Sequence, residues 1–241
     1  LMELNDTEAA DKKLSELEKL IPDHPGVNFA RGRMLITEGK DVEGLQALSR
    51  VLSVMPDHSP TLYLAANANV RQGNIATAQQ QFARLIREQP DNIPARLQMA
   101  ALNLRQNDAR SAERVAREIL EENKMNVPAM RILALALATQ GQYAQSAEVY
   151  QEVSTLAPDS VQDRAGLGAA QLMSGDTEAG VRELEQALAM NPDNVPLRER
   201  LISVYLAQGD VDKAGKAVAD YLAVADDAVR ARLFAARVAL Q

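Results

Sequence analysis

Histidine is the residue in this chain best suited to acid–base or metal chemistry, and it occurs twice, at His24 and His58. Each follows a Pro-Asp pair, and the two positions are 34 residues apart. Equivalent turns of neighbouring helix layers lie roughly 10 Å apart, which is too far for two side chains to share a metal ion. The chain has no cysteine to complete a transition-metal site. We therefore interpret both histidines as polar turn residues and predict no metal site.

The other motifs that could carry chemistry are incomplete. The acid pair Glu121-Glu122 falls at an expected helix end, where solvated carboxylates are common. Gly166-Leu167-Gly168 lacks the third glycine and the preceding strand of a phosphate-binding loop. No nucleophile stands with a base and an orienting group in a recognisable set. The sequence therefore predicts a protein that is not an enzyme and binds no cofactor.

Composition narrows the class of partner. The 241 residues carry a net charge of −7, whereas general nucleic-acid binding needs a dense cationic face. No apolar run approaches the roughly 18 residues of a membrane-spanning helix. Aromatic residues make up 3% and tryptophan is absent, which is typical of a thin structure built from Ala and Leu. We expect a protein or peptide partner, no nucleic acid, and no direct membrane span.

The sequence repeats with a period of 34 residues, and this period predicts where the helices begin, end and cross. Glycine or asparagine marks the end of one helix, where a left-handed backbone is expected; these residues are Gly39, Gly73, Asn107, Gly141, Gly175 and Gly209. Small side chains follow where two helices cross closely, at Ala10, Gly44, Ala78, Ala112, Ser146, Gly180 and Ala214. Prolines end the second helix, at Pro22, Pro56, Pro90, Pro158 and Pro192.

This period predicts an all-α fold, a right-handed α-solenoid (superhelix) of 34-residue antiparallel helix pairs. We expect a single domain over residues 1–241 with six full repeats and a half-repeat at each end. The full repeats are 25–58, 59–92, 93–126, 127–160, 161–194 and 195–228. The half-units 1–24 and 229–241 lack a partner helix, as in a fragment of a longer chain. We therefore expect their apolar faces, including Leu14, Leu17, Leu20 and Leu233, to be partly exposed.

The repeats resemble the tetratricopeptide repeat (TPR) over the whole chain, with close matches at 170–176 and 184–192. More weakly, the strings at 206–214 and 174–179 resemble the bacterial lipoproteins of exosortase and exopolysaccharide gene clusters, the PEP-CTERM-associated TPR family. That second resemblance implies a periplasmic or outer-membrane-associated protein; the residues themselves leave the compartment undetermined.

The TPR resemblance implies that the first helix of each pair lines a concave groove that binds a peptide or a partner helix. The frame assigns to this groove Phe29, Arg33, Tyr63, Asn67, Arg71, Leu97, Gln98, Arg105, Arg131, Leu135, Leu172, Met173 and Arg200, together with one acid, Glu199. Five arginines in an acidic chain either solubilise an exposed face or bind an acidic partner segment. The Lys and Asn residues of a chaperone carboxylate clamp are absent from the matching positions, which hold Phe29, Arg33, Leu64, Pro94 and Gln98.

The sequence thus predicts a non-catalytic protein–protein interaction scaffold. The lipoprotein resemblance implies a role in assembling a bacterial cell-envelope or exopolysaccharide export complex. The alternative is a cytosolic regulatory or sensor module whose repeats bind a peptide signal.

Overall fold

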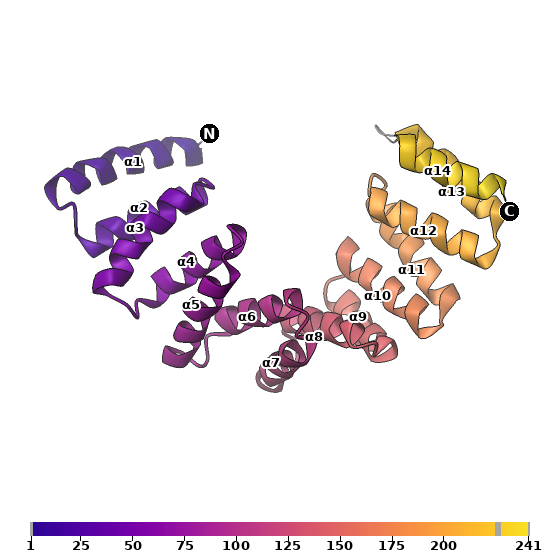
Figure 1. Ribbon diagram of the computed structural model, residues 1–241, viewed down its shortest axis with the longest axis horizontal. Coiled ribbons are helices and arrows are strands. Elements are labelled where there is room, and N and C mark those ends of the chain that lie inside the picture. The colour runs from indigo at the N-terminus through magenta and orange to yellow at the C-terminus, as the bar shows by residue number, and fades with distance from the viewer. Residues whose placement is uncertain (1, 225–227, 241) are drawn as a thin grey trace. The chain divides into compact units, whose positions relative to one another are not determined.

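Fourteen helices and no strand make up the regular structure of residues 2–224 and 228–240, the part of the chain that the computed structural model describes. The predicted all-α fold of helix pairs is therefore confirmed (Figure 1). The chain forms two compact units, Leu1–Gln106 (unit 1) and Asn107–Gln241 (unit 2). That the whole chain is one continuous domain stays a prediction.

Within each unit, helices that follow one another in sequence pack side by side. Unit 1 contains α1 (Met2–Leu20), α2 (Pro25–Thr37), α3 (Asp41–Val54), α4 (Ser59–Arg71), α5 (Ile75–Glu88) and α6 (Ile93–Arg105). Unit 2 contains α7 (Ala109–Glu122), α8 (Val127–Thr139), α9 (Tyr143–Leu156), α10 (Val161–Ser174), α11 (Thr177–Met190), α12 (Val195–Gln208), α13 (Val211–Val224) and α14 (Ala228–Ala239).

Asparagine caps fix where several first helices begin. The side chains of Asn92, Asn126 and Asn194 each accept a hydrogen bond from a backbone N–H in the first turn of the helix that follows. Each of these helices also has a proline within its first two positions, where the missing N–H has no intrahelical partner to lose. The inter-repeat Asn-x-Pro sequence therefore starts a helix at a defined residue.

The residues that end the first helices adopt the left-handed backbone expected of them. Gly73 has a φ of 77°, and Asn107 is the non-glycine residue of the described chain with a positive φ, 64°. A Cβ added at Gly73 would meet no atom within 4 Å, so backbone conformation rather than space selects glycine there. The predicted left-handed turns are confirmed.

Small residues allow helix pairs to cross closely, as the period predicted. A Cβ on Gly180 of α11 would lie 2.7 Å from the carbonyl oxygen of Gly168 on α10 and 2.6 Å from Cγ of Leu172. At the equivalent crossing of α8 and α9, the Ser146 hydroxyl donates a 2.8 Å hydrogen bond to the carbonyl oxygen of Ala134. These contacts set the spacing of the two helices in a pair.

Each unit has its own core of leucine and alanine with a few aromatic rings. In unit 1, Phe82 and Leu85 of α5 are fully buried. The terminal helices are less covered: Leu17 is 44% and Leu233 62% exposed, as predicted, although Leu14 is buried. No helix of the described residues is both long and apolar enough to span a bilayer.

Candidate functional site

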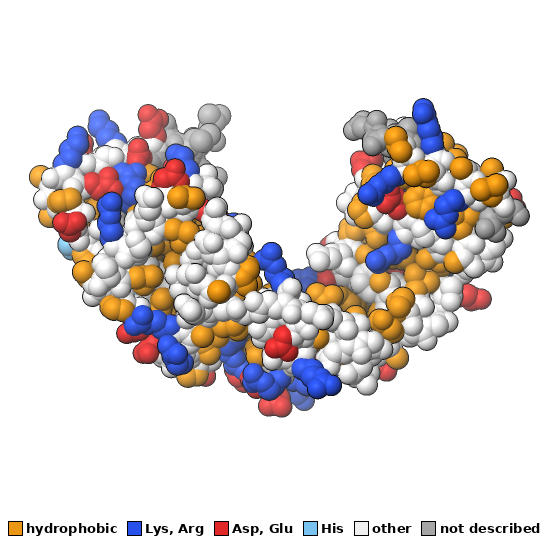
Figure 2. All heavy atoms as spheres, viewed as in Figure 1, with side chains coloured by type: hydrophobic (Ala, Val, Ile, Leu, Met, Phe, Trp, Pro, Cys, Tyr) orange, Lys and Arg blue, Asp and Glu red, His pale blue; other side chains and the backbone are white. Residues whose placement is uncertain are grey.

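A groove between α10 and α12 in unit 2 has the clearest binding geometry. It has a volume of about 500 Å³ and an apolar lining with a polar rim. The lining residues are Ala169, Leu172, Met173, Thr177, Arg200, Ser203, Val204, Ala207 and Gln208. Three of them, Leu172, Met173 and Arg200, belong to the groove predicted from the sequence. In Figure 2, hydrophobic side chains reach the surface over the part of unit 2 that holds α10 to α13.

Small side chains at one repeat position make room for this groove. Ala169 and Ser203, one 34-residue period apart, occupy the repeat position that Asn67, Ala101 and Leu135 hold in the preceding repeats, so two successive repeats both have a small side chain there. The shorter side chains leave a depression that the larger ones would occupy. The groove is therefore a local feature of the last repeats rather than a property shared by every repeat.

The walls of the groove are held by packing beneath them. Leu172 packs against the core of unit 2, and the close crossing at Gly168 and Gly180 brings α11 against its side chain. Met173, the next residue, is 60% exposed at the groove wall. Methionine is flexible and polarisable, so it can adapt its shape to a bound side chain. The α10 wall thus combines a fixed side chain, Leu172, with an adaptable one, Met173.

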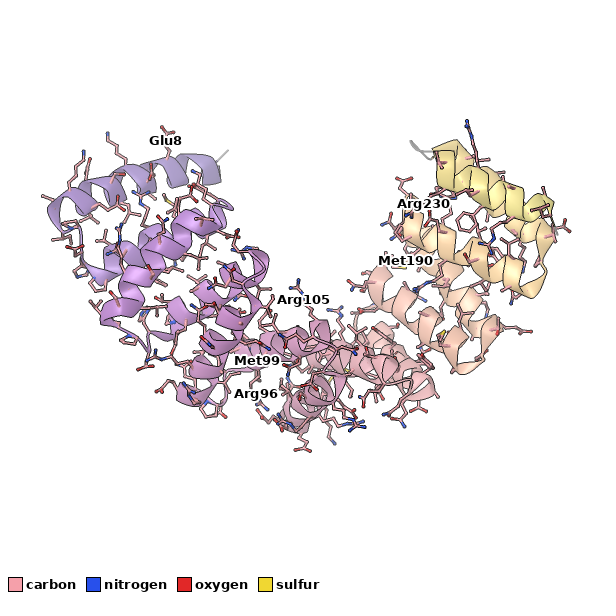
Figure 3. All side chains as sticks on the ribbon, in the orientation of Figure 1. Glu8, Arg96, Met99, Arg105, Met190 and Arg230 are labelled. Carbon is pink, nitrogen blue, oxygen red and sulfur yellow. The ribbon has the colours of Figure 1, made fainter. Side chains whose placement is uncertain are left out.

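Arg200 and Glu199 are neighbours in sequence but have different surroundings. Glu199 accepts a 2.8 Å hydrogen bond from the Tyr221 hydroxyl of α13, and Arg230 of α14 lies 3.3 Å from its other oxygen. Arg230 lies in the first turn of α14 (Figure 3). Arg200 is exposed on the groove rim, and no described side chain forms an ion pair with it. The acid predicted for this face is therefore engaged inside the fold, whereas the arginine is free.

Arg71, by contrast, is held by an acid of the preceding repeat. Its Nε donates a 2.9 Å hydrogen bond to Oδ2 of Asp41, and its Nη2 donates a 2.5 Å hydrogen bond to Oδ1. Asp41 lies in the first turn of α3, where the helix dipole favours a negative charge, and its side chain is 6% exposed. The hydrogen bonds from Arg71 lower the pKa of Asp41, although burial opposes this effect. Arg71 is thus a structural residue as well as a surface one.

Arg131 forms a second pair with a buried aspartate, in unit 2, but with an acid of the following repeat. Its Nε lies 2.9 Å and its Nη2 2.6 Å from carboxylate oxygens of Asp163, whose side chain is 3% exposed. Ser160 caps α10 by accepting a hydrogen bond from the Asp163 backbone N–H, which fixes this acid in the first turn. The hydrogen bonds to Asp163 raise the pKa of Arg131. Burial raises the pKa of the nearby Tyr150, whose ring packs against Gly166.

The predicted aromatic residues of unit 1 pack on their own fold. The ring of Phe29 meets His58 edge-on at a centroid distance of 5.3 Å, and Tyr63 meets Phe82 edge-on at 6.0 Å. His58 also shares a 2.7 Å hydrogen bond with the hydroxyl of Thr61. The Phe29 and Tyr63 rings are half-buried, so each exposes an edge of the core and not a free aromatic face.

The remaining predicted residues are dispersed. Asn67 donates a 2.8 Å hydrogen bond to the backbone oxygen of Tyr63. Arg33 lines a depression of about 440 Å³ between α1 and α2, together with Lys13. Arg105 extends from the end of α6 (Figure 3). Leu97 and Gln98 of α6 are half-buried, and Leu135 of α8 is 48% exposed.

The groove also contains residues that the repeat frame did not predict: Ala169 on α10, and Ser203, Val204 and Ala207 on α12. A sequence signal existed for Ala169 and Ser203, which are small residues at one repeat position in two successive repeats, whereas Val204 and Ala207 hold other repeat positions. Within the described ranges, no three His, Asp or Glu side chains come together as a metal site would require.

Comparison with known proteins identifies the class of the fold. A family model described as tetratricopeptide repeat matches residues 35–100 and 171–238, and a second with the same description matches 97–161. The chain belongs to the tetratricopeptide repeat family, whose repeats make it a protein–protein interaction scaffold. No curated protein matches the sequence.

Solved structures of similar fold share little sequence with this chain. A tetratricopeptide repeat protein from Parabacteroides merdae is 17% identical with a TM-score of 0.74, covering 99% of this chain and 94% of that one. The C-terminal part of a repeat protein from Cytophaga hutchinsonii is 13% identical with a TM-score of 0.71, covering 97% and 96%. YrrB, described as a TPR protein with an unusual peptide-binding site, is 14% identical with a TM-score of 0.63, covering 76% and 95%.

Proposed function

We propose that this chain is a non-catalytic scaffold whose α10/α12 groove binds a segment of a partner protein. The observation that carries the proposal is the apolar lining of the groove, with Met173 exposed at its wall and Arg200 on its rim. Large exposed apolar side chains gathered in a depression are typical of interaction sites. The peptide-binding site described for YrrB supports a peptide as the bound species.

A single apolar side chain can supply much of the affinity at such a site. Burying a side chain of leucine size contributes about 1.5–3 kcal/mol. This corresponds to roughly one to two orders of magnitude in the dissociation constant. We therefore expect one anchor residue of the partner to dominate binding, with the rim setting its orientation.

The test uses peptides selected from a random phage-displayed library on the immobilised chain. Ala207→Trp fills the groove from α12, and we expect it to weaken the selected synthetic peptides about 10-fold or more because the anchor loses its site. Ala219→Trp on α13 adds the same side chain at an exposed position outside the groove, so it serves as the matched control. Circular dichroism checks that both variants keep their helices.

Equal binding of the selected peptides by Ala207→Trp, Ala219→Trp and the parent would overturn the α10/α12 groove as the binding site. A library that yields no binder after repeated selection would also count against a peptide-binding function.

We further propose that the partner belongs to a bacterial cell-envelope or exopolysaccharide export assembly. The strings at 206–214 and 174–179 support this setting through the lipoprotein resemblance. The alternative is a cytosolic regulatory module that binds a peptide signal. Capture of partners from separated envelope and cytosolic fractions, with Ala207→Trp as the negative control, distinguishes the two. A groove-dependent partner found in the cytosol alone would exclude the envelope role.

A further inference from the structure

We infer that the partner segment held in the α10/α12 groove carries an acidic side chain beside its apolar anchor, and that Arg200 binds this carboxylate. The inference rests on the proposed function and specifies the chemistry of its ligand. It depends on the charges that line the groove and on where the acids of this face are engaged.

The charged part of the groove lining is cationic. Among the described residues of the lining, Arg200 is the one that is charged, and none is a carboxylate. The whole chain is acidic, with a net charge of −7, so the sign at the groove is opposite to that of the protein. A concave apolar wall also focuses the field of a rim charge more than a flat surface does. The groove therefore favours a negative group on the ligand.

The nearest acid in sequence is occupied by other partners. Glu199 binds the Tyr221 hydroxyl at 2.8 Å and lies 3.3 Å from Arg230, which ties α12 to α13 and α14. No ion pair joins Glu199 to Arg200 in the described structure. The carboxylate that could have neutralised the rim is thus engaged in holding the last helices together.

Other arginines on the first helices show what Arg200 lacks. Arg71 and Arg131 each bind a buried aspartate through two donor atoms, Asp41 and Asp163 respectively. An arginine guanidinium suits this geometry because its planar fork matches the two oxygens of a carboxylate. Arg200 presents the same fork to solvent with no described acid opposite it. An acidic residue of the partner would complete the arrangement.

The helix geometry sets the spacing of the ligand groups. Arg200, Ser203, Val204 and Ala207 follow one another along one stripe of α12. With a rise of 1.5 Å per residue, Arg200 lies about 6 Å from Val204 and about 10 Å from Ala207 along the helix axis. An extended peptide covers that distance in about two or three residues. We expect the acid to stand two or three positions from the apolar anchor.

The experiment compares libraries selected on the parent and on Arg200→Glu. Peptides from the parent should combine a large apolar residue with Asp or Glu at the stated spacing. Those from Arg200→Glu should lose the acid and gain Lys or Arg, because reversing the rim charge repels a carboxylate. The control is Arg182→Glu, the same charge change on the exposed side of α11, outside the groove lining.

Synthetic peptides then test the charge directly. Changing the selected acid to its amide should weaken binding to the parent about 3- to 10-fold, a range that allows for the partial exposure of the pair. The same change should not weaken binding to Arg200→Glu and should strengthen it, because the amide is not repelled by the introduced glutamate. The loss on the parent should shrink as salt rises.

The outcomes separate the two proposals. Peptides with an apolar anchor and no acid enrichment, still sensitive to Ala207→Trp, would overturn the role of Arg200 and leave the groove intact. Selection that is insensitive to Ala207→Trp would overturn the groove itself. Equal loss on amide substitution for the parent and Arg200→Glu would place the carboxylate contact elsewhere.

Discussion

Asp41 and Arg71 come from consecutive repeats and are joined by two hydrogen bonds, Nε to Oδ2 at 2.9 Å and Nη2 to Oδ1 at 2.5 Å. The acid lies at the start of a second helix and the arginine at the end of the next first helix. The pair therefore links α3 to α4 through side chains as well as through packing. Because Asp41 is buried, its charge depends on Arg71 for compensation.

Replacing Arg71 by leucine should destabilise unit 1. The change leaves a buried carboxylate without its cation, and we expect a loss of about 1–3 kcal/mol, less than for a fully buried pair because half of the Arg71 side chain is exposed. Arg50→Leu removes an exposed arginine of α3 and should change stability by less than about 0.5 kcal/mol. Urea unfolding followed by circular dichroism measures both; equal losses would contradict a structural role for the pair.

The difference between the parent and Arg71→Leu should depend on pH. Arg71 lowers the pKa of Asp41 in the folded protein, so the pair stabilises the fold above the unfolded carboxyl pKa and loses this effect as pH falls through the folded value. In Arg71→Leu, burial favours the protonated acid instead. We expect the difference in unfolding free energy to be largest near pH 7 and to narrow between about pH 5 and pH 3. A difference that stays constant over this range would rule out Asp41 as the titrating group.

Gly180→Ala should destabilise unit 2 and disturb the groove. The added Cβ would lie 2.7 Å from the backbone oxygen of Gly168, so α10 and α11 must move apart at a cost of about 1–3 kcal/mol. Gly215→Ala in α13 is the matched control, because among the described atoms its Cβ would meet only Val238, at 3.8 Å. Alanine there should be neutral or stabilising by up to about 1 kcal/mol. Thermal unfolding that ranks the two variants the other way would contradict the close crossing.

Substitutions of Ser146 show whether side-chain volume or hydrogen bonding contributes more to stability at the crossing of α8 and α9. Its hydroxyl binds the Ala134 carbonyl, yet equivalent positions in other repeats hold Ala78, Ala112 and Ala214. We expect Ser146→Ala to cost less than about 1 kcal/mol, because it removes both the donor and the need to satisfy it. Ser146→Val should cost about 1–3 kcal/mol by overpacking. Comparable urea midpoints for the two variants would indicate that packing at this crossing is loose.

Substitutions in the left-handed turns measure the cost of backbone strain apart from that of packing. Gly73→Ala should cost about 1–2 kcal/mol, since its Cβ meets no neighbour and the strain comes from the positive φ alone. Asn107→Gly should be neutral or slightly stabilising, because it relieves the smaller strain of asparagine at a φ of 64°. Denaturation curves of the two single variants measure these effects. A clear loss of stability in Asn107→Gly would show that the asparagine side chain stabilises its turn.

The sequence by itself determined the helical period, because the residues that end and start each helix act on backbone only a few positions away. Glycine at Gly73 and asparagine at Asn107 permit a left-handed turn, and Asn92 starts the next helix through its own side chain. Each of these effects involves residues a few positions apart, so it can be inferred without knowing the fold. The small residues at helix crossings, such as Gly180, were also predictable because the period repeats them.

Only the tertiary structure decided which arginines are free. Arg71, Arg131 and Arg200 occupy similar faces of first helices, but the first two face buried aspartates about one repeat away and Arg200 faces none among the described residues. An ion pair depends on the distance and direction between two side chains on different helices, and residue spacing does not fix either. The depth of the α10/α12 groove likewise comes from small residues on two helices, Ala169 and Ala207, whose joint effect exists only once the fold brings both helices to the same groove.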